Sequence, residues 1–139
     1  VVLGGVGVLR NLPDEVDAVV SMCRLGDADI RTDMPHIEVR LIDRPENDEN
    51  PHLDYVLLQA VRAIEELRAQ GHTVLVHCVG AYSRTPTMGS LYGMRLRSVD
   101  AERALSDVIA VLPGANPNRA FRAALKRAEQ HRPVETVAR

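Results

Sequence analysis

The stretch TVLVHCVGAYSRTP, residues 73–86, decides how this chain folds. Its first part, TVLVH, is too short and too rich in β-branched residues for a helix, and it predicts a buried central strand over residues 73–77. A helix is predicted to begin at Thr85, because the proline that follows is tolerated in a first turn, where its missing N–H has no partner inside the helix. Between strand and helix lies a tight loop, residues 78–84, which we call the cysteine loop.

Hydrophobic periodicity predicts further elements before this stretch. Two strands are expected over residues 17–22 and 36–42, and a polar loop with two prolines follows over residues 43–51. An apolar stripe at helical spacing then predicts a helix that begins at Leu53 and ends at Gly71. The cysteine loop is therefore preceded by two strands, a long loop and a helix.

Two more helices are expected after the one that follows the cysteine loop. The first is capped by Asp100 or Ser98 and has Ile109 on its inner face, and the second begins near Ala120. Strands followed by helices of this length indicate an α/β fold with a central, largely parallel sheet flanked by helices. The length predicts a single domain over residues 1–139.

Composition limits the classes of partner. The 139 residues have a formal net charge of −2, so no broad basic surface for nucleic acid is expected. The apolar runs are far too short to span a bilayer, so no membrane partner is expected either. The two cysteines form no CxxC pair, which predicts neither a disulfide framework nor a metal site, and no cofactor. A reducing, cytoplasmic location is predicted on the same grounds.

The cysteine loop has the features of a phosphate-binding site. The spacing of cysteine and arginine is weak by itself, because 17 of the 139 residues are Lys or Arg, but the strand before and the helix after add weight. A tight loop that leads from a parallel strand into a helix N-terminus turns main-chain N–H groups toward a common centre. The guanidinium of Arg84 can hold two phosphate oxygens at once. The predicted phosphate-binding residues are Val79, Gly80, Ala81, Tyr82, Ser83 and Arg84.

The same surroundings favour a nucleophilic thiolate at Cys78. Cysteines in such settings titrate at roughly 3.5–7.5 instead of near 8.5, so we expect Cys78 to be ionised at neutral pH. A thiolate beneath a bound phosphomonoester is placed for in-line attack on phosphorus, which gives a phosphocysteine that water later hydrolyses. The Thr85 hydroxyl is expected to donate to the sulfur and ease its departure. His77 is expected to orient the loop and tune the thiol.

The arrangement of His77, Cys78, five further residues, Arg84 and Thr85 resembles the signature of the cysteine-based protein tyrosine and dual-specificity phosphatases. The similarity extends over most of the chain, toward the compact dual-specificity type, and includes PGANPNRAF at residues 113–121. It implies a catalytic domain that acts on a phosphorylated protein or a small phosphomonoester. In some bacterial chains such a domain is joined to an ADP-ribosylglycohydrolase, and the absence of an initiator Met is compatible with a longer multidomain chain.

A phosphatase also needs an acid that protonates the leaving oxygen. We choose Asp43, because it follows a predicted strand at the same carboxyl edge of the sheet as Cys78. The resembled family has its general acid at this position, ten residues before Leu53. Asp48 is the alternative acid. Activity is expected to be highest at mildly acid pH, with Cys78 deprotonated and the acid protonated.

Some alternatives stay open at this point. The family usually has glycine three residues after the cysteine, where this chain has Ala81, and a positive φ there would cost alanine about 1–2 kcal/mol. The alternative function is therefore a catalytically weak or inactive module that binds phosphate or phosphoproteins. Sulfur transfer by a rhodanese-like domain is a third interpretation, but it does not explain Thr85. Cys23 is expected in the core, with a reversible disulfide to Cys78 as the minor alternative.

Overall fold

Four short strands form one parallel sheet in the computed structural model, which describes residues 1–46 and 48–130. The strands are β1 (Val2–Gly4), β2 (Ala18–Ser21), β3 (His36–Glu38) and β4 (Val74–His77). Their order in the sheet is β1-β4-β2-β3, so the strand that leads into the cysteine loop is central, as predicted. Residues 131–139 of the predicted domain lie outside the described residues.

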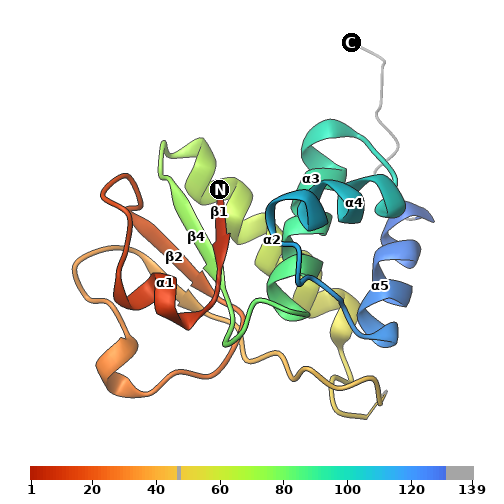
Figure 1. Ribbon diagram of the computed structural model, residues 1–139, viewed down its shortest axis with the longest axis horizontal. Helices are drawn as coiled ribbons and strands as arrows, with labels where there is room; N and C mark the ends of the chain where they lie inside the picture. Colours follow the sequence, from red (N-terminus) through yellow and green to blue (C-terminus); the bar gives the residue numbers. More distant parts are fainter. Residues whose placement is uncertain (47, 131–139) are drawn as a thin grey trace.

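Helices cover both faces of the sheet unequally (Figure 1). The helices are α1 (Val6–Arg10), the 3-10 helix η1 (Asp27–Asp29), α2 (Leu53–Ala69), α3 (Arg84–Arg97), α4 (Ala101–Val111) and α5 (Arg119–Gln130). Helices α2 to α5 lie together on one side, with α3 in contact with α2, α4, α5, β1 and β4. Helix α1 packs against β1 and β4. The chain thus has the predicted α/β fold. Among the described helices, none is both long and apolar enough to cross a lipid bilayer.

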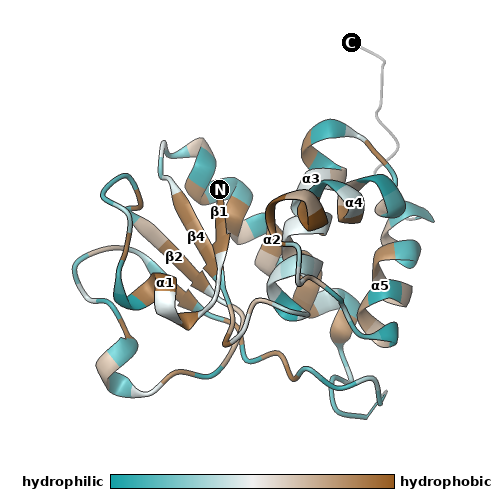
Figure 2. Cartoon of the chain, in the orientation of Figure 1, coloured by the Kyte–Doolittle hydropathy of each residue, from teal (hydrophilic) through white to brown (hydrophobic). Residues whose placement is uncertain are grey.

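Alternation of side chains along the strands builds a separate core on each face of the sheet. Val74, Val76 and Cys78 belong to the larger core, which includes the buried face of α2. Leu75 and Val19 belong to the smaller core. Figure 2 shows β2 and β4 in brown, the colour of hydrophobic residues. Because successive residues face opposite sides, Cys78 faces the helices, and His77 lies on the face of the smaller core.

The first ten residues hold a strand and a helix that the sequence analysis did not predict. Strand β1 pairs with β4, from Val2↔Leu75 to Gly4↔His77. Gly5 then turns the chain into α1 so closely to the cysteine loop that a Cβ at this position would lie 2.7 Å from the carbonyl oxygen of Val79. Glycine is uncommon in strands, so the glycines here hid both elements.

Two predicted boundaries next to the cysteine loop are wrong, one at the end of β3 and one, by a single residue, at the start of α3. Strand β3 ends at Glu38 instead of residue 42, because the chain turns where the Leu41 N–H donates to the Val39 carbonyl at 3.0 Å. Helix α3 begins at Arg84 instead of Thr85. Both differences lie next to the cysteine loop, at the end of β3 and at the start of α3.

Helix α4 decides between the two predicted caps. The Asp100 carboxylate accepts a hydrogen bond from the Arg103 N–H at 2.8 Å, so Asp100 is the cap, and Ser98 ends the preceding helix. Ile109 is 38% exposed, which contradicts its predicted place on the inner face. Ala101, Leu105 and Val108, predicted on the same face, are buried as expected.

Candidate active site

Cys78 lies directly after β4, and 2% of its surface is exposed. Its Sγ is 3.0 Å from Oγ1 of Thr85, in the first turn of α3, so the threonine hydroxyl can donate to the sulfur. The same hydroxyl lies 3.2 Å from the Gly4 carbonyl oxygen. Cys23 is buried in the same core, as expected, and both thiols are free. Burial raises the pKa of the Cys23 thiol above its ordinary value.

The cysteine loop carries a run of main-chain donors without protein acceptors. None of the N–H groups of residues 79–84 donates a hydrogen bond to any part of the chain that the structure describes. These groups stand where β4 leads into the N-terminus of α3, the end of a helix at which its dipole favours negative charge. An anion at this position would meet several donors at once.

Three carbonyl groups of the same loop are held by the surrounding protein. The acceptors are the carbonyl oxygens of Cys78, Val79 and Tyr82. Their donors are His77 Nδ1 at 3.1 Å, the Val6 N–H at 3.0 Å and the Asn116 N–H at 2.6 Å, respectively. Across a trans peptide the C=O and the following N–H point in opposite directions, so the N–H groups of residues 79, 80 and 83 face away from these donors. The loop is thus anchored through its carbonyls, and its N–H groups are left available.

Arg84 connects the cysteine loop to the segment that carries Asp43. Its Nη1 donates to the carbonyl oxygen of Leu41 at 3.0 Å, two residues before Asp43. Its Nε is buried and has no hydrogen-bond partner among the described residues. A buried N–H of a charged group without an acceptor is costly, so Nε is a donor available to an anionic ligand.

Asn118 joins the same two segments by a second route. Its Nδ2 donates to Oδ1 of Asp43 at 2.9 Å, and its main-chain N–H donates to Oγ of Ser83 at 3.0 Å. Its Oδ1 accepts from the Phe121 N–H at 3.0 Å and so caps α5. The sequence analysis did not predict the contact between Asn118 and Asp43, which lie 75 positions apart. Asp48, the alternative acid, makes no hydrogen bond or ion pair within the described chain.

His77 is fully buried beside the first peptide of the cysteine loop. Its Nδ1 lies 3.1 Å from the Cys78 carbonyl oxygen, and its Nε2 lies 2.5 Å from Oγ of Ser21. Burial lowers the pKa of His77 below its ordinary value near 6.5, which favours a neutral imidazole. The position suits a residue that orients the loop. The sequence analysis missed Ser21, whose place beside His77 depends on the register of β2 and β4.

Ala81 has a φ of 62°, in the left-handed region that favours glycine. The positive φ that makes alanine energetically costly at this position is therefore present. Val79 and Tyr82 are 57% and 65% exposed, so the outer surface of the loop is partly apolar.

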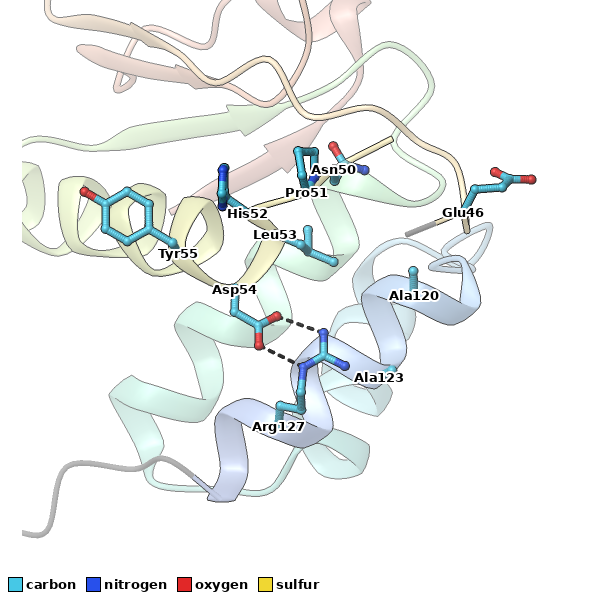
Figure 3. A pocket seen from close by; sticks show the side chains of 10 residues that line it. All are labelled: Glu46, Asn50, Pro51, His52, Leu53, Asp54, Tyr55, Ala120, Ala123 and Arg127. Carbon is cyan, nitrogen blue, oxygen red and sulfur yellow. Dashed lines mark hydrogen bonds and ion pairs between the residues drawn. The ribbon is translucent and has the colours of Figure 1, made fainter. Parts of the chain in front are cut away.

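A pocket of about 440 Å³ lies near the loop that follows Asp43 (Figure 3). It is lined by Glu46, Asn50, Pro51, His52, Leu53, Asp54, Tyr55, Ala120, Ala123 and Arg127. An ion pair of 2.8 Å between Asp54 and Arg127 connects α2 to α5 at its wall. The cysteine loop contributes nothing to this lining. Within residues 1–46 and 48–130, no group of three or more His, Cys, Asp or Glu side chains is arranged to hold a metal ion.

Comparison with known sequences places the chain in a family. The family described as "Dual specificity phosphatase, catalytic domain" matches residues 14–131. Dual specificity protein phosphatase 22 of Mus musculus is 37% identical over 73 residues, which cover 52% of this chain and 40% of that protein. Dual specificity protein phosphatase 12 of Homo sapiens is 32% identical over 94 residues, which cover 68% of this chain and 26% of that protein. The chain thus spans less than half the length of these relatives.

Solved structures agree with the sequence comparison. A mouse protein assigned as a dual specificity phosphatase, complexed with zinc tungstate, has a TM-score of 0.77 and 25% identity, covering 92% of this chain and 80% of that one. Human DUSP28 has a TM-score of 0.74 and 25% identity, covering 90% and 82%. With a family match over most of its length and the same fold as these structures, the chain belongs to the dual specificity phosphatase catalytic-domain family.

Proposed function

We propose that residues 1–139 form one catalytic domain that hydrolyses phosphomonoesters on phosphorylated proteins, as a cysteine-dependent phosphatase of the tyrosine or dual-specificity type. The observation that carries the proposal is a set of donors in the cysteine loop that have no acceptor among the described residues: the N–H groups of residues 79–84 and the buried Nε of Arg84. The relatives are protein phosphatases by name, and the mouse structure is a complex with tungstate, a tetrahedral oxyanion like phosphate.

The first chemical step transfers the phosphoryl group to sulfur. The Cys78 thiolate attacks phosphorus in line with the ester oxygen, so the S–P bond forms as the P–O bond breaks. The loop N–H groups and Arg84 stabilise the negative charge on the three remaining oxygens. Asp43 gives its proton to the leaving oxygen. Because Oδ1 of Asp43 accepts from Asn118, Oδ2 is the oxygen that carries this proton.

The second step returns the enzyme to its starting state. Water attacks phosphorus, the S–P bond breaks, and the Asp43 carboxylate takes the proton of the water. The departing sulfur of Cys78 accepts a hydrogen bond from Thr85, whose Oγ1 is already 3.0 Å away. Inorganic phosphate is released, and no cofactor takes part.

A pair of cysteine variants tests the proposal. The chain should release phosphate from p-nitrophenyl phosphate and from a phosphotyrosine peptide. Cys78→Ser keeps the size of the side chain but removes the nucleophile, and it should lower kcat by about 1000-fold or more. Cys23→Ser makes the same change at the other buried thiol of the same core and should retain activity close to that of the wild type.

Vanadate binding separates the proposed enzyme from a binding module on the same fold. A folded wild-type protein that binds vanadate but releases no phosphate would overturn the enzymatic proposal and support the module. Equal activity in Cys78→Ser and wild type would overturn the assignment of the nucleophile.

A further inference from the structure

A chain of hydrogen bonds runs through the protein to the cysteine loop and ends at the carbonyl group of Cys78. It links the Arg31 N–H to His36, His36 to Ser21, Ser21 to His77, and His77 to Cys78. The successive distances are 2.8 Å (N to Nδ1), 2.7 Å (Nε2 to Oγ), 2.5 Å (Oγ to Nε2) and 3.1 Å (Nδ1 to O). Of these residues, only Cys78 belongs to the cysteine loop.

Strand register explains why these side chains meet. Ser21 and His77 are directly paired across β2 and β4, so they share a face of the sheet. His36 is paired with Val19, two residues before Ser21, and so lies on that same face. Ser21 and His77 have 0% of their surfaces exposed, and His36 is half-buried. A polar group that is left without a partner at such depth is destabilising, so each bond in the chain matters.

The direction of every bond follows from its first member. The Arg31 main-chain N–H can only donate, so Nδ1 of His36 is an acceptor and the proton of this ring is on Nε2. His36 then donates to Ser21, which leaves the Ser21 hydroxyl proton for Nε2 of His77. His77 must therefore hold its own proton on Nδ1, which donates to the Cys78 carbonyl. Burial lowers the pKa of both histidines, in keeping with two neutral rings.

The last bond determines how the loop begins. With the Cys78 carbonyl turned toward Nδ1–H of His77, the N–H of residue 79 points the opposite way across the same planar peptide. That N–H is the first of the cysteine-loop donors that have no acceptor in the part of the chain that the structure describes. The other tautomer of His77 would place a lone pair against the carbonyl oxygen and favour rotation of this peptide. The tautomer of His77 thus controls the first donor of the loop.

We infer that Ser21 and His36 are positioning residues of the active site: they fix the tautomer of His77 and, through it, the peptide between Cys78 and Val79. Neither residue touches the phosphate. The inference rests on the proposed function for its consequence in catalysis. Its structural part is that the donor-to-acceptor direction of these hydrogen bonds governs the reactivity of the Cys78 thiol, and this can be measured without turnover.

The first experiment compares two buried serines. Ser21→Ala removes the link to His77, whereas Ser90→Ala removes a buried hydroxyl that has no hydrogen-bond partner within the described residues. Alkylation of Cys78 by iodoacetate, followed by mass spectrometry of its peptide, gives the rate at each pH. In Ser21→Ala the rate near pH 6 should fall about tenfold, and its half-maximal point should move to higher pH. Ser90→Ala should match the wild type.

A second pair keeps the test decisive where Ser21→Ala fails to fold. His36→Gln preserves the direction of both hydrogen bonds, because the glutamine amide oxygen can accept from the Arg31 N–H and the amide nitrogen can donate to Ser21. His36→Leu removes both hydrogen bonds at the same half-buried position. His36→Leu should therefore reproduce the slow alkylation and should weaken vanadate binding about tenfold, and His36→Gln should restore both.

A purely structural role for these residues predicts a different result. If Ser21→Ala and His36→Leu lower the melting temperature but leave the pH profile of Cys78 alkylation unchanged, the inference is overturned. Absence of phosphate release by the wild type would refute the proposed function instead. The alkylation comparison would still decide whether Ser21 and His36 position the loop.

Discussion

Ala81 shows how one residue sets the conformational cost of the cysteine loop. Its φ of 62° is one that an L-residue other than glycine adopts at a cost of about 1–2 kcal/mol. The loop nevertheless keeps this conformation, because the carbonyls of Val79 and Tyr82 on either side are bonded to Val6 and Asn116. These two hydrogen bonds hold the backbone between them in place, so the strain stays in the loop that is proposed to bind the anion.

Replacing Ala81 with glycine should relieve this strain. Glycine gains about 1–2 kcal/mol at a positive φ but loses about 0.4–1 kcal/mol through the entropy of the unfolded chain. Ala81→Gly should therefore raise the free energy of unfolding in urea by about 0.5–1 kcal/mol and should tighten vanadate binding.

Ser98 provides the matched control, because it is the other non-glycine residue with a positive φ among those described, at 54°, and it ends α3 away from the loop. Ser98→Gly should gain similar stability without any change in vanadate affinity. Equal effects of the two variants on vanadate binding would show that Ala81 strain has no bearing on the anion site.

The residues that sequence analysis identified and those it missed differ in how far apart their partners lie. Cys78, Arg84 and Thr85 belong to one strand-loop-helix segment, so their proximity follows from local structure. Ser21 bonds to His77 across 56 positions, and Asn118 bonds to Asp43 across 75. Such pairs depend on strand register and helix packing, which no local pattern specifies.

At the scale of elements, the N-terminus of α5 connects the loop that carries Asp43 to the cysteine loop. Asn118 caps α5, and the same side chain bonds to Asp43, while its main chain bonds to Ser83. The start of the helix therefore contacts both segments to which the proposed function assigns catalytic roles. The polar loop after β3 and α5 were both predicted, but their contact was not, because hydrophobic periodicity says which face of a helix is buried and not what its end touches.

Asn118→Ser separates the two roles of this side chain. Serine is as good a cap as asparagine, so the free energy of unfolding should change by less than about 0.5 kcal/mol. Its side chain is too short to reach Asp43, so protonation of the leaving group should become less efficient. The kcat for phenyl phosphate should fall about tenfold further than that for p-nitrophenyl phosphate, whose leaving group needs less help.

Asp43→Asn serves as the reference for this pattern, since it removes the proposed acid itself. The two variants should show the same dependence on the leaving group, with the larger effect in Asp43→Asn. A uniform loss for both substrates in Asn118→Ser would contradict the role of Asn118 in placing Asp43.

On the scale of the whole molecule, titrating groups divide into a buried set and a surface set. Arginine partners at the surface lower the pKa of Asp29, Asp33 and Glu38 below ordinary values of 3.8–4.5. The stabilisation from these carboxylates is present above their unfolded values and is lost only at pH well below 5. Burial lowers the pKa of His36 and His77 from an ordinary value of 6.5. Below about pH 6.5, and above the range in which these carboxylates titrate, the two histidines therefore contribute to the pH dependence of folding.

We predict that the free energy of unfolding falls as the pH is lowered through this window. Below about pH 6.5 the unfolded chain binds more protons at the two histidines than the folded protein does, so acid favours unfolding. The free energy of unfolding falls by at most about 1.4 kcal/mol per pH unit for each ring. Urea denaturation at several pH values gives the slope. His36→Gln, which keeps the hydrogen bonds but cannot titrate, should make the slope shallower, whereas His52→Gln, at an exposed position, should not. A slope in His36→Gln as steep as that of the wild type would mean that His36 takes up a proton as readily in the folded protein as in the unfolded chain. The series of hydrogen bonds from Arg31 to Cys78, which requires neutral histidine rings, would then be contradicted.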